Sequence, residues 1–206
     1  MCAPVRSTDS TPSARAWGLR HAGPVALAVL LAACASTPSQ DRDGPPQSVP
    51  ALAHVRDAEP KIEPIRSGGP NRPYRVFERD YVPLTQDVAF RQTGLASWYG
   101  RKYHGRPTSS GEIYDMFAMT VAHPTLPIPS YARISNPAKG RSVVVRVNDR
   151  GPFHTGRIVD LSYAVAWKLD LLGAVAPVEL ERITFEKIRD GSWRRPSLHS
   201  GGTNPF

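Results

Sequence analysis

Apolar and polar residues alternate over several short segments in the second half of the chain. An alternation with a period of two residues is typical of strands that have one buried face. The turn residues Asn-Pro-Ala-Lys-Gly at 136–140 join two of these segments into a predicted hairpin. The predicted strands are residues 94–99, 131–135, 142–148, 157–160 and 177–188.

Two further segments, residues 114–122 and 161–171, have helical patterns instead. Asp160 or Ser162 stands where a polar side chain would cap the start of the second helix. Several short strands, many turns and two short helices predict a mainly β domain built as a small closed barrel. The periodicity alone predicts no more than this.

The beginning of the chain has the pattern of a secretory signal. Arg15 and Arg20 precede an apolar run at 25–33, which is too short for a bilayer span of roughly 20 residues. The run ends Leu-Ala-Ala-Cys, which is similar to a bacterial lipobox and predicts a signal peptide at 1–33 and lipid modification of Cys34. The alternative is an ordinary signal with a chance cysteine. Ser-Thr-Pro at 36–38 lacks the aspartate of inner-membrane retention, so we expect an anchor at the outer membrane, facing the periplasm.

Composition divides the rest of the chain into three parts. Residues 34–69 are rich in proline and contain no aromatic residue, so they predict a lipidated N-terminus and a flexible tether. Residues 70–188 have the size of one domain. Residues 189–206 have the composition of a disordered tail.

The net charge and the histidine and cysteine residues limit the partners and cofactors that we expect. The formal net charge of +8 suits an anionic polymer, lipid head groups or nucleic acid. Export makes nucleic acid an unexpected partner, and the sequence carries no helix-turn-helix, zinc-finger or RNA-binding signature. The six histidines show no metal-ligand spacing, and the only cysteines are Cys2 and Cys34. We therefore expect no cofactor, no metal and no disulfide.

Five blocks of sequence carry a more specific signal. They are GLASWYG at 94–100, HGRPTSSGEIYDMFAMTVAH at 104–123, LPIPSYARISN at 126–136, GRSVVVRVNDRGPF at 140–153 and RIVDLSYAVA at 157–166. With these blocks, residues 71–188 resemble the rare lipoprotein A family of septal-ring lytic transglycosylases. The resemblance implies a six-stranded double-psi β-barrel and cleavage of peptidoglycan glycan strands without water. Several family members also carry a C-terminal glycan-binding repeat domain. No such domain follows the barrel here, which leaves septal targeting and division-site partners open.

The resemblance also carries catalytic positions onto this chain. The family pattern places them at Glu112, His123 and Asp149. A similar barrel in expansins, family-45 endoglucanases and membrane-bound lytic transglycosylase A has a second aspartate, which corresponds to Asp160. We expect Asp149 to be essential, Glu112 or Asp160 to share the acid and base work, and His123 to orient substrate. The expected substrate-binding residues are Trp98, Tyr99, Arg106 and Arg150.

Each catalytic candidate also has a structural interpretation. Asp160 would cap a helix, and Asp149 would pair with Arg150 or Arg146 or hold the turn. Glu112 would be a solvated loop residue or the capping partner of Ser109, and His123 would be a hydrogen-bonded structural histidine. The chemistry adds a constraint, because a carboxyl with a pKa near 4 is about 99.9% ionised at pH 7. Raising that pKa to about 6 requires roughly 2.7 kcal/mol, and nearby arginines act in the opposite direction. Two acids that share a site are therefore favoured over a lone carboxylate.

The sequence thus predicts a lytic transglycosylase that cuts the bond between N-acetylmuramic acid (MurNAc) and N-acetylglucosamine (GlcNAc). Its product would end in a 1,6-anhydromuramyl group, and its role would lie in wall remodelling and daughter-cell separation. The alternatives are a non-catalytic, expansin-like or division-site scaffold that binds glycan, and a hydrolase that uses water.

Overall fold

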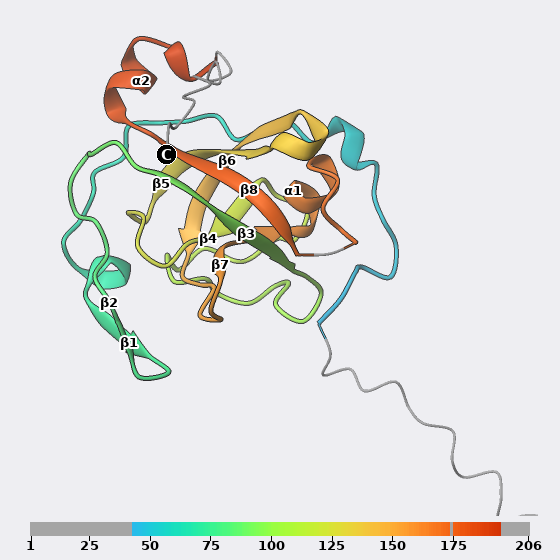
Figure 1. Ribbon diagram of the computed structural model, residues 1–206, viewed down its shortest axis with the longest axis horizontal. Coiled ribbons are helices and arrows are strands. Elements are labelled where there is room, and N and C mark those ends of the chain that lie inside the picture. Colours follow the sequence, from blue (N-terminus) through green and yellow to red (C-terminus); the bar gives the residue numbers. More distant parts are fainter. Residues whose placement is uncertain (1–42, 174, 195–206) are drawn as a thin grey trace, which may run out of the picture. The chain divides into compact units, whose positions relative to one another are not determined.

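A computed structural model describes residues 43–173 and 175–194 of the chain. Six strands form a closed barrel (Figure 1) in the order β3-β7-β4-β6-β5-β8, and β8 pairs back onto β3. The pairs β3–β7 and β4–β6 are parallel, while the other four are antiparallel. The predicted fold class, a mainly β double-psi barrel, is therefore confirmed. The barrel strands are β3 (Arg91–Tyr99), β4 (Thr120–Ala122), β5 (Ser130–Asn136), β6 (Arg141–Asp149), β7 (Arg157–Ser162) and β8 (Ala176–Ile183).

Branched apolar side chains fill the inside of the barrel. Val121 of β4, Val145 and Val147 of β6, and Val159 and Leu161 of β7 are all fully buried. Burying a side chain of this size contributes roughly 1.5–3 kcal/mol relative to leaving it in water. The short strand β4 is held between two longer neighbours, so its backbone is paired on both edges.

One predicted helix is present and shorter than expected. Helix α1 spans Tyr163–Lys168, and the hydroxyl of Ser162 caps it by accepting a hydrogen bond from the Val165 amide. Because Ser162 provides this cap, the carboxyl of Asp160 is not needed for it.

The other predicted helix, at 114–122, is wrong. Residues 114–119 form irregular turns, and Thr120–Ala122 is strand β4. Pairing with β6 and β7 outweighs the local helical pattern there. The predicted last strand also ends early, at Ile183, because Thr184 caps a second helix, α2 (Phe185–Arg189).

Smaller elements surround the barrel. A hairpin of β1 (Tyr74–Val76) and β2 (Arg79–Tyr81) projects from one end (Figure 1). Four 3₁₀ turns complete the described chain: η1 (Leu52–His54), η2 (Gly69–Asn71), η3 (Pro137–Lys139) and η4 (Ser192–Arg194). No helix in residues 43–173 and 175–194 has the length and apolar character needed to cross a membrane.

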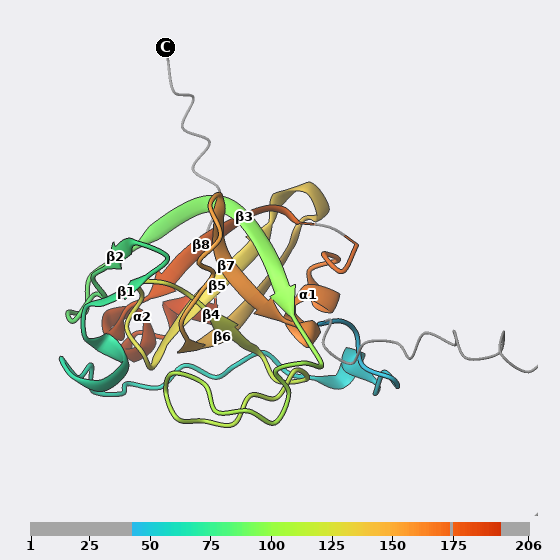
Figure 2. The same cartoon turned by 90° about the horizontal axis from the view of Figure 1, so that it is seen from below.

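The Pro-rich segment at 43–69 differs from the flexible tether that its composition predicts. Figure 2 shows it running along the outside of the barrel, from the neighbourhood of α1 towards the β1–β2 hairpin. Leu52 is only 2% exposed and packs with the barrel core. The carboxylate of Asp57 accepts hydrogen bonds from the Val144 amide and from Lys168. The predicted signal peptide, Cys34 and the tail beyond residue 194 lie outside the described residues.

Substituting Leu52 tests whether this segment is part of the folded domain. Leu52→Ala should lower the free energy of unfolding by about 2–5 kcal/mol, because it leaves a cavity in the core. The matched control is Val49→Ala, since Val49 lies in the same segment and is 54% exposed; it should change stability by no more than about 0.5 kcal/mol. Chemical denaturation measures both, and equal effects of the two variants would show that the segment is a free tether.

Candidate active site

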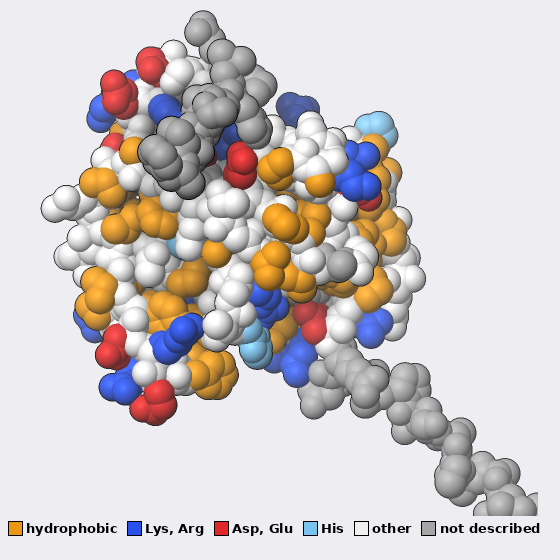
Figure 3. Space-filling view, viewed as in Figure 1, with side chains coloured by type: hydrophobic (Ala, Val, Ile, Leu, Met, Phe, Trp, Pro, Cys, Tyr) orange, Lys and Arg blue, Asp and Glu red, His pale blue; other side chains and the backbone are white. Residues whose placement is uncertain are grey.

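A cavity of about 460 Å³ opens at one end of the barrel, and two of the predicted acids line it. Its volume is within the usual range for small-molecule sites. In Figure 3, acidic, basic and histidine side chains gather at the lower edge of the molecule, next to the hydrophobic residues of the β1–β2 hairpin. The cavity is lined by Asp43, Phe77, Trp98, Tyr99, Tyr103, Ala122, Asp149, Arg150, Gly151, Pro152, Phe153, His154, Arg157 and Asp160.

Strand pairing brings Asp149 and Asp160 together. Ala122 of β4 is in register with Asp149 of β6 on one side and with Asp160 of β7 on the other. Two strand spacings separate the two backbones, which is about 10 Å. The small side chain of Ala122 lies between the acids and lines the cavity with them. The two carboxyls therefore face a common space, as the sequence predicts.

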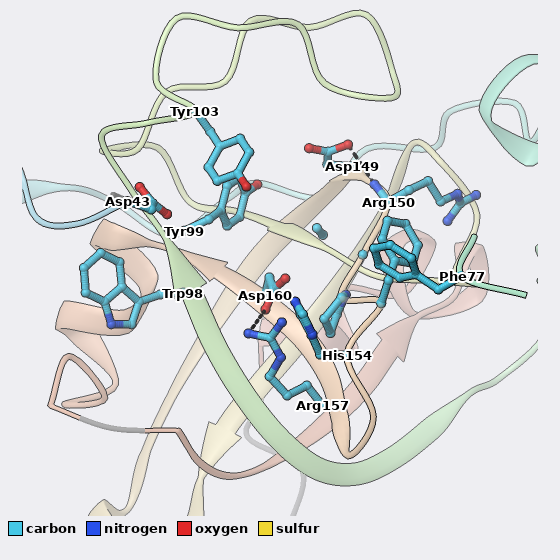
Figure 4. A pocket seen from close by; sticks show the side chains of 14 residues that line it. Asp43, Phe77, Trp98, Tyr99, Tyr103, Asp149, Arg150, His154, Arg157 and Asp160 are labelled. Carbon is cyan, nitrogen blue, oxygen red and sulfur yellow. Dashed lines mark hydrogen bonds and ion pairs between the residues drawn. The ribbon is translucent and has the colours of Figure 1, made fainter. Parts of the chain in front are cut away.

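Asp160 is largely buried and is held by residues of β3 and of its own strand. Ser97, its register partner on β3, donates a hydrogen bond to Oδ1. Arg157 donates to the Ser97 hydroxyl at 2.6 Å, and its guanidinium lies 3.6 Å from the same Oδ1 (Figure 4). Oδ2 is near Gly151, which has φ +131° and where a β-carbon would stand 3.7 Å from that oxygen.

Burial has the largest effect on the pKa of Asp160. It raises the pKa of this carboxyl above its ordinary value, and the charge of Asp149 adds to the increase. The Ser97 hydrogen bond and the positive charges of Arg157 and His154 act in the opposite direction but are outweighed. A carboxyl with a raised pKa keeps its proton to higher pH, which is what a general acid requires.

Asp149 is held by the loop that precedes β4. Its Oδ1 accepts hydrogen bonds from the Ser109 amide at 2.9 Å, the Ser109 hydroxyl at 2.6 Å and the Arg150 amide at 2.8 Å. These three bonds fix the orientation of the carboxylate at the end of β6. The predicted pairing of this acid with the side chain of Arg146 or Arg150 is absent from the contacts of Asp149 described here.

Glu112 lies in the same loop but not among the residues that line the cavity. Its carboxylate accepts hydrogen bonds from Arg146 at 2.7 Å and from Asn148 at 2.9 Å. Burial opposes ionisation of Glu112, but these hydrogen bonds outweigh it and lower the pKa. Arg146 also pairs with Glu63 of the N-terminal segment. Glu112 therefore fixes the loop that carries Ser109, and its predicted part in proton transfer stays a prediction.

His123 is buried beside β4 and is also absent from the cavity lining. Its Nδ1 accepts hydrogen bonds from the amides of Thr125 and Leu126, and its Nε2 lies 3.1 Å from the Gln92 side-chain oxygen. Burial, with a contribution from the charge of Arg150, lowers the pKa of His123 to about 3. A neutral imidazole that donates from Nε2 satisfies all three contacts. This geometry matches the structural interpretation of His123, and a role in orienting substrate stays a prediction.

The predicted substrate-binding residues divide into two groups. Trp98 and Tyr99 line the cavity. Arg150 also lines it, but its guanidinium is occupied by the carbonyl oxygens of Pro70, His123 and Leu126 and by Asn71. Arg106 is exposed and is absent from the cavity lining.

Several residues that line the cavity or support its acids are not predicted as site residues by the sequence. Ser97 supports Asp160 only because the parallel β3–β7 pairing places them side by side, and a sequence pattern does not show that register. Asp43 accepts hydrogen bonds from the Gly100 and Lys102 amides and so closes one edge of the cavity. Phe77 and His154 come from turns, where no periodicity marks them.

Within the described residues, 43–173 and 175–194, no cluster of three or more His, Cys, Asp or Glu side chains is placed to hold a metal ion.

The titration of His123 tests its structural assignment. In the unfolded chain a histidine binds a proton below about pH 6.5, while folded His123 stays neutral to about pH 3. Stability therefore falls as the pH is lowered, and this group alone should remove about 2 kcal/mol between pH 7 and pH 5. In His123→Gln the loss of stability between pH 7 and pH 5 should be smaller by this amount. NMR of the imidazole should show no titration above pH 4, and a midpoint near 6.5 would contradict the assignment.

Comparisons with known proteins show the family of this chain. Residues 91–180, from β3 into β8, match a domain family described as lytic transglycolase. Endolytic peptidoglycan transglycosylase RlpA of Vibrio cholerae is 47% identical over 165 residues, which cover 78% of this chain and 62% of that protein. The protein of the same name from Neisseria meningitidis is 53% identical over 128 residues, or 62% of this chain and 53% of that protein. The one from Pseudomonas aeruginosa is 38% identical over 206 residues, or 92% of this chain and 57% of that protein.

The chain therefore spans only 53% to 62% of the length of these three relatives. The family match runs through β3, β4, β6 and β7 and therefore includes Asp149 and Asp160. On these matches and the closed double-psi barrel, the chain belongs to the rare lipoprotein A family.

Proposed function

We propose that this chain is a lytic transglycosylase that cleaves the MurNAc–GlcNAc bond of peptidoglycan and leaves a 1,6-anhydromuramyl end. The observation that carries the proposal is the pair of acids in one open cavity, where Asp160 has a raised pKa and Asp149 faces it across Ala122. The printed names of the relatives, endolytic peptidoglycan transglycosylases, support the same substrate class.

In the first step, Asp160 donates its proton to the glycosidic oxygen. The bond between C1 of MurNAc and that oxygen breaks, and GlcNAc leaves with a hydroxyl group. Positive charge then develops on the MurNAc ring as an oxocarbenium ion. The negative charge of Asp149, held in place by Ser109, stabilises this ion across the cavity.

In the second step, the 6-hydroxyl of the same MurNAc attacks C1, and Asp160, now a carboxylate, takes its proton. The new C1–O6 bond closes the 1,6-anhydro ring, and Asp160 returns to its protonated form. No water is consumed, so one group acts first as acid and then as base. Ser97 and Arg157 stabilise the charged form of Asp160 between the two steps.

The location of the enzyme is part of the proposal. Lipid modification of Cys34 would anchor the chain at the outer membrane, with the barrel facing the periplasm and its glycan substrate. The lipobox-like sequence and the missing retention aspartate at 36–38 support this location. The net charge of +8 favours an acidic polymer. We extend the proposal to wall remodelling and daughter-cell separation, with division-site proteins as partners.

Substitution of each acid tests the proposed chemistry. Asp160→Asn should reduce formation of 1,6-anhydromuramyl products from sacculi at least about 10³-fold, because it removes the transferable proton. Asp149→Asn should also cause a large loss. The control is Asp170→Asn, which removes an exposed carboxylate that pairs with Lys139 outside the cavity.

Mass spectrometry of the digests separates the alternatives. Products with reducing ends would indicate a hydrolase. Glycan binding without any cleavage product from the unmodified chain would indicate an expansin-like scaffold. Either result would contradict the proposed function.

The pH dependence of cleavage tests which carboxyl is the acid. Activity should fall as the pH rises through the pKa of Asp160, because the acid must be protonated at the start. The Ser97 hydrogen bond lowers this pKa, so Ser97→Ala should move the alkaline limb of the profile to higher pH. Glu112→Gln should leave the position of that limb unchanged. A limb that moves with Glu112→Gln and not with Ser97→Ala would assign the proton to Glu112 instead.

A further inference from the structure

The turn of the β1–β2 hairpin has an unusual composition. Its two residues, Phe77 and Glu78, have φ angles of +48° and +60°. Two-residue hairpin turns with positive φ angles favour Asn and Gly, because a β-carbon is strained in this region. Any other residue type carries a free-energy cost at these φ angles. Phe77 does not recover this cost by burial, because it is 74% exposed. A bulky ring in a strained, exposed turn suggests a functional reason.

The hairpin that carries Phe77 is fixed to the barrel. The rings of Tyr74 and Tyr81 stack at 5.1 Å, and Phe153 contacts both of them edge-on at 6.0 and 5.6 Å. The Tyr74 hydroxyl donates a hydrogen bond to the Pro124 carbonyl at 2.8 Å. Since Phe153 belongs to the turn after Asp149, the hairpin is attached to the wall of the cavity itself. Phe77 is therefore held at a fixed place.

Phe77 lies at the opposite end of the cavity from Trp98, Tyr99 and Tyr103. In Figure 4, Trp98 and Tyr103 lie on one side of Asp160 and Phe77 lies on the other. Tyr103 is 44% exposed and packs edge-on against Tyr99. Both ends of the cavity thus offer partly exposed aromatic rings, with the two acids between them.

We propose that Phe77 is a stacking platform for a sugar ring of the glycan strand, beyond the two sugars that flank the bond to be cut. The apolar face of a pyranose ring packs well on an exposed aromatic ring, and such a contact adds binding area without charge. The substrate class that this arrangement fits is a glycan polymer with sugars on both sides of the bond, and not a terminal disaccharide. The inference rests on the proposed function, because it places the scissile bond at Asp160.

The test uses variants that distinguish the effect of the Phe77 ring from the effect of the turn conformation. Phe77→Asn removes the ring but suits the positive φ, so the melting temperature should not fall. Phe77→Trp keeps an aromatic face. Val82→Asn is the matched control, because Val82 lies just beyond β2 and is 68% exposed. Each change is made in the full chain carrying Asp160→Asn, so that bound glycan is not cut.

Affinity is measured for peptide-free glycan strands and for the MurNAc–GlcNAc disaccharide. We expect Phe77→Asn to weaken strand binding about tenfold and disaccharide binding less than twofold, while Phe77→Trp and Val82→Asn bind strands like the parent. Unchanged strand binding by Phe77→Asn would overturn the inference, and so would an equal loss for strands and disaccharide. A loss of strand binding by Phe77→Trp as large as that of Phe77→Asn would also overturn it.

The unmodified chain distinguishes this inference from the proposed function. If it forms no anhydro products while strand binding still depends on Phe77, the proposed function fails and the platform stands. If it forms these products and Phe77→Asn binds strands normally, the platform fails and the function stands.

Discussion

The pairing of β4 between β6 and β7 is the constraint on which the site depends. Thr120–Ala122 pairs in parallel with β6, and Val121 and Ala122 also pair antiparallel with β7. This arrangement puts Asp149 and Asp160 in register with Ala122, although the two acids belong to different strands. Residues 151–154 of the loop between them line the cavity. The fully buried Val121 fixes β4 in the core. The same packing that closes the barrel therefore also sets the spacing of the acids.

The surroundings of the acids give them different chemical characters. Asp160 is largely buried, and this burial raises its pKa, with a smaller contribution from the charge of Asp149. Glu112 binds Arg146 and Asn148, and its pKa is lowered. An ionised Glu112 suits a structural task, and it anchors the loop whose Ser109 orients Asp149. In the proposed function, proton transfer is thus separated from the positioning of the second acid. The N-terminal segment contributes to both regions, through Glu63 at Arg146 and Asp43 at the cavity edge.

The sequence predicts the barrel and the proximity of Asp149 and Asp160, but not the contacts that set the pKa of Asp160. The sequence is enough to find β5 and β6, because apolar and polar residues alternate along β5 and β6 carries the run of branched residues Val143–Val145. It fails at Thr120–Ala122, where pairing on both edges outweighs a local helical pattern. The proline-rich composition of 43–69 hides Leu52 and Asp57, whose tertiary contacts bind the segment to the barrel. Ser97 and Phe77 carry no pattern of their own, since their roles depend on a long-range register and on an exposed turn.

In the proposed function Asp160 holds the transferable proton because burial raises its pKa, with a smaller contribution from the charge of Asp149. The most direct measurement is an NMR titration of the side-chain carboxyl carbons in the unmodified chain and in Asp149→Asn. We expect the pKa of Asp160 to lie above its ordinary value of about 4. In Asp149→Asn the pKa of Asp160 should be lower, because the charge of Asp149 raises it. A pKa for Asp160 at or below the ordinary value, with Glu112 titrating as the most basic carboxyl of the site, would contradict this assignment.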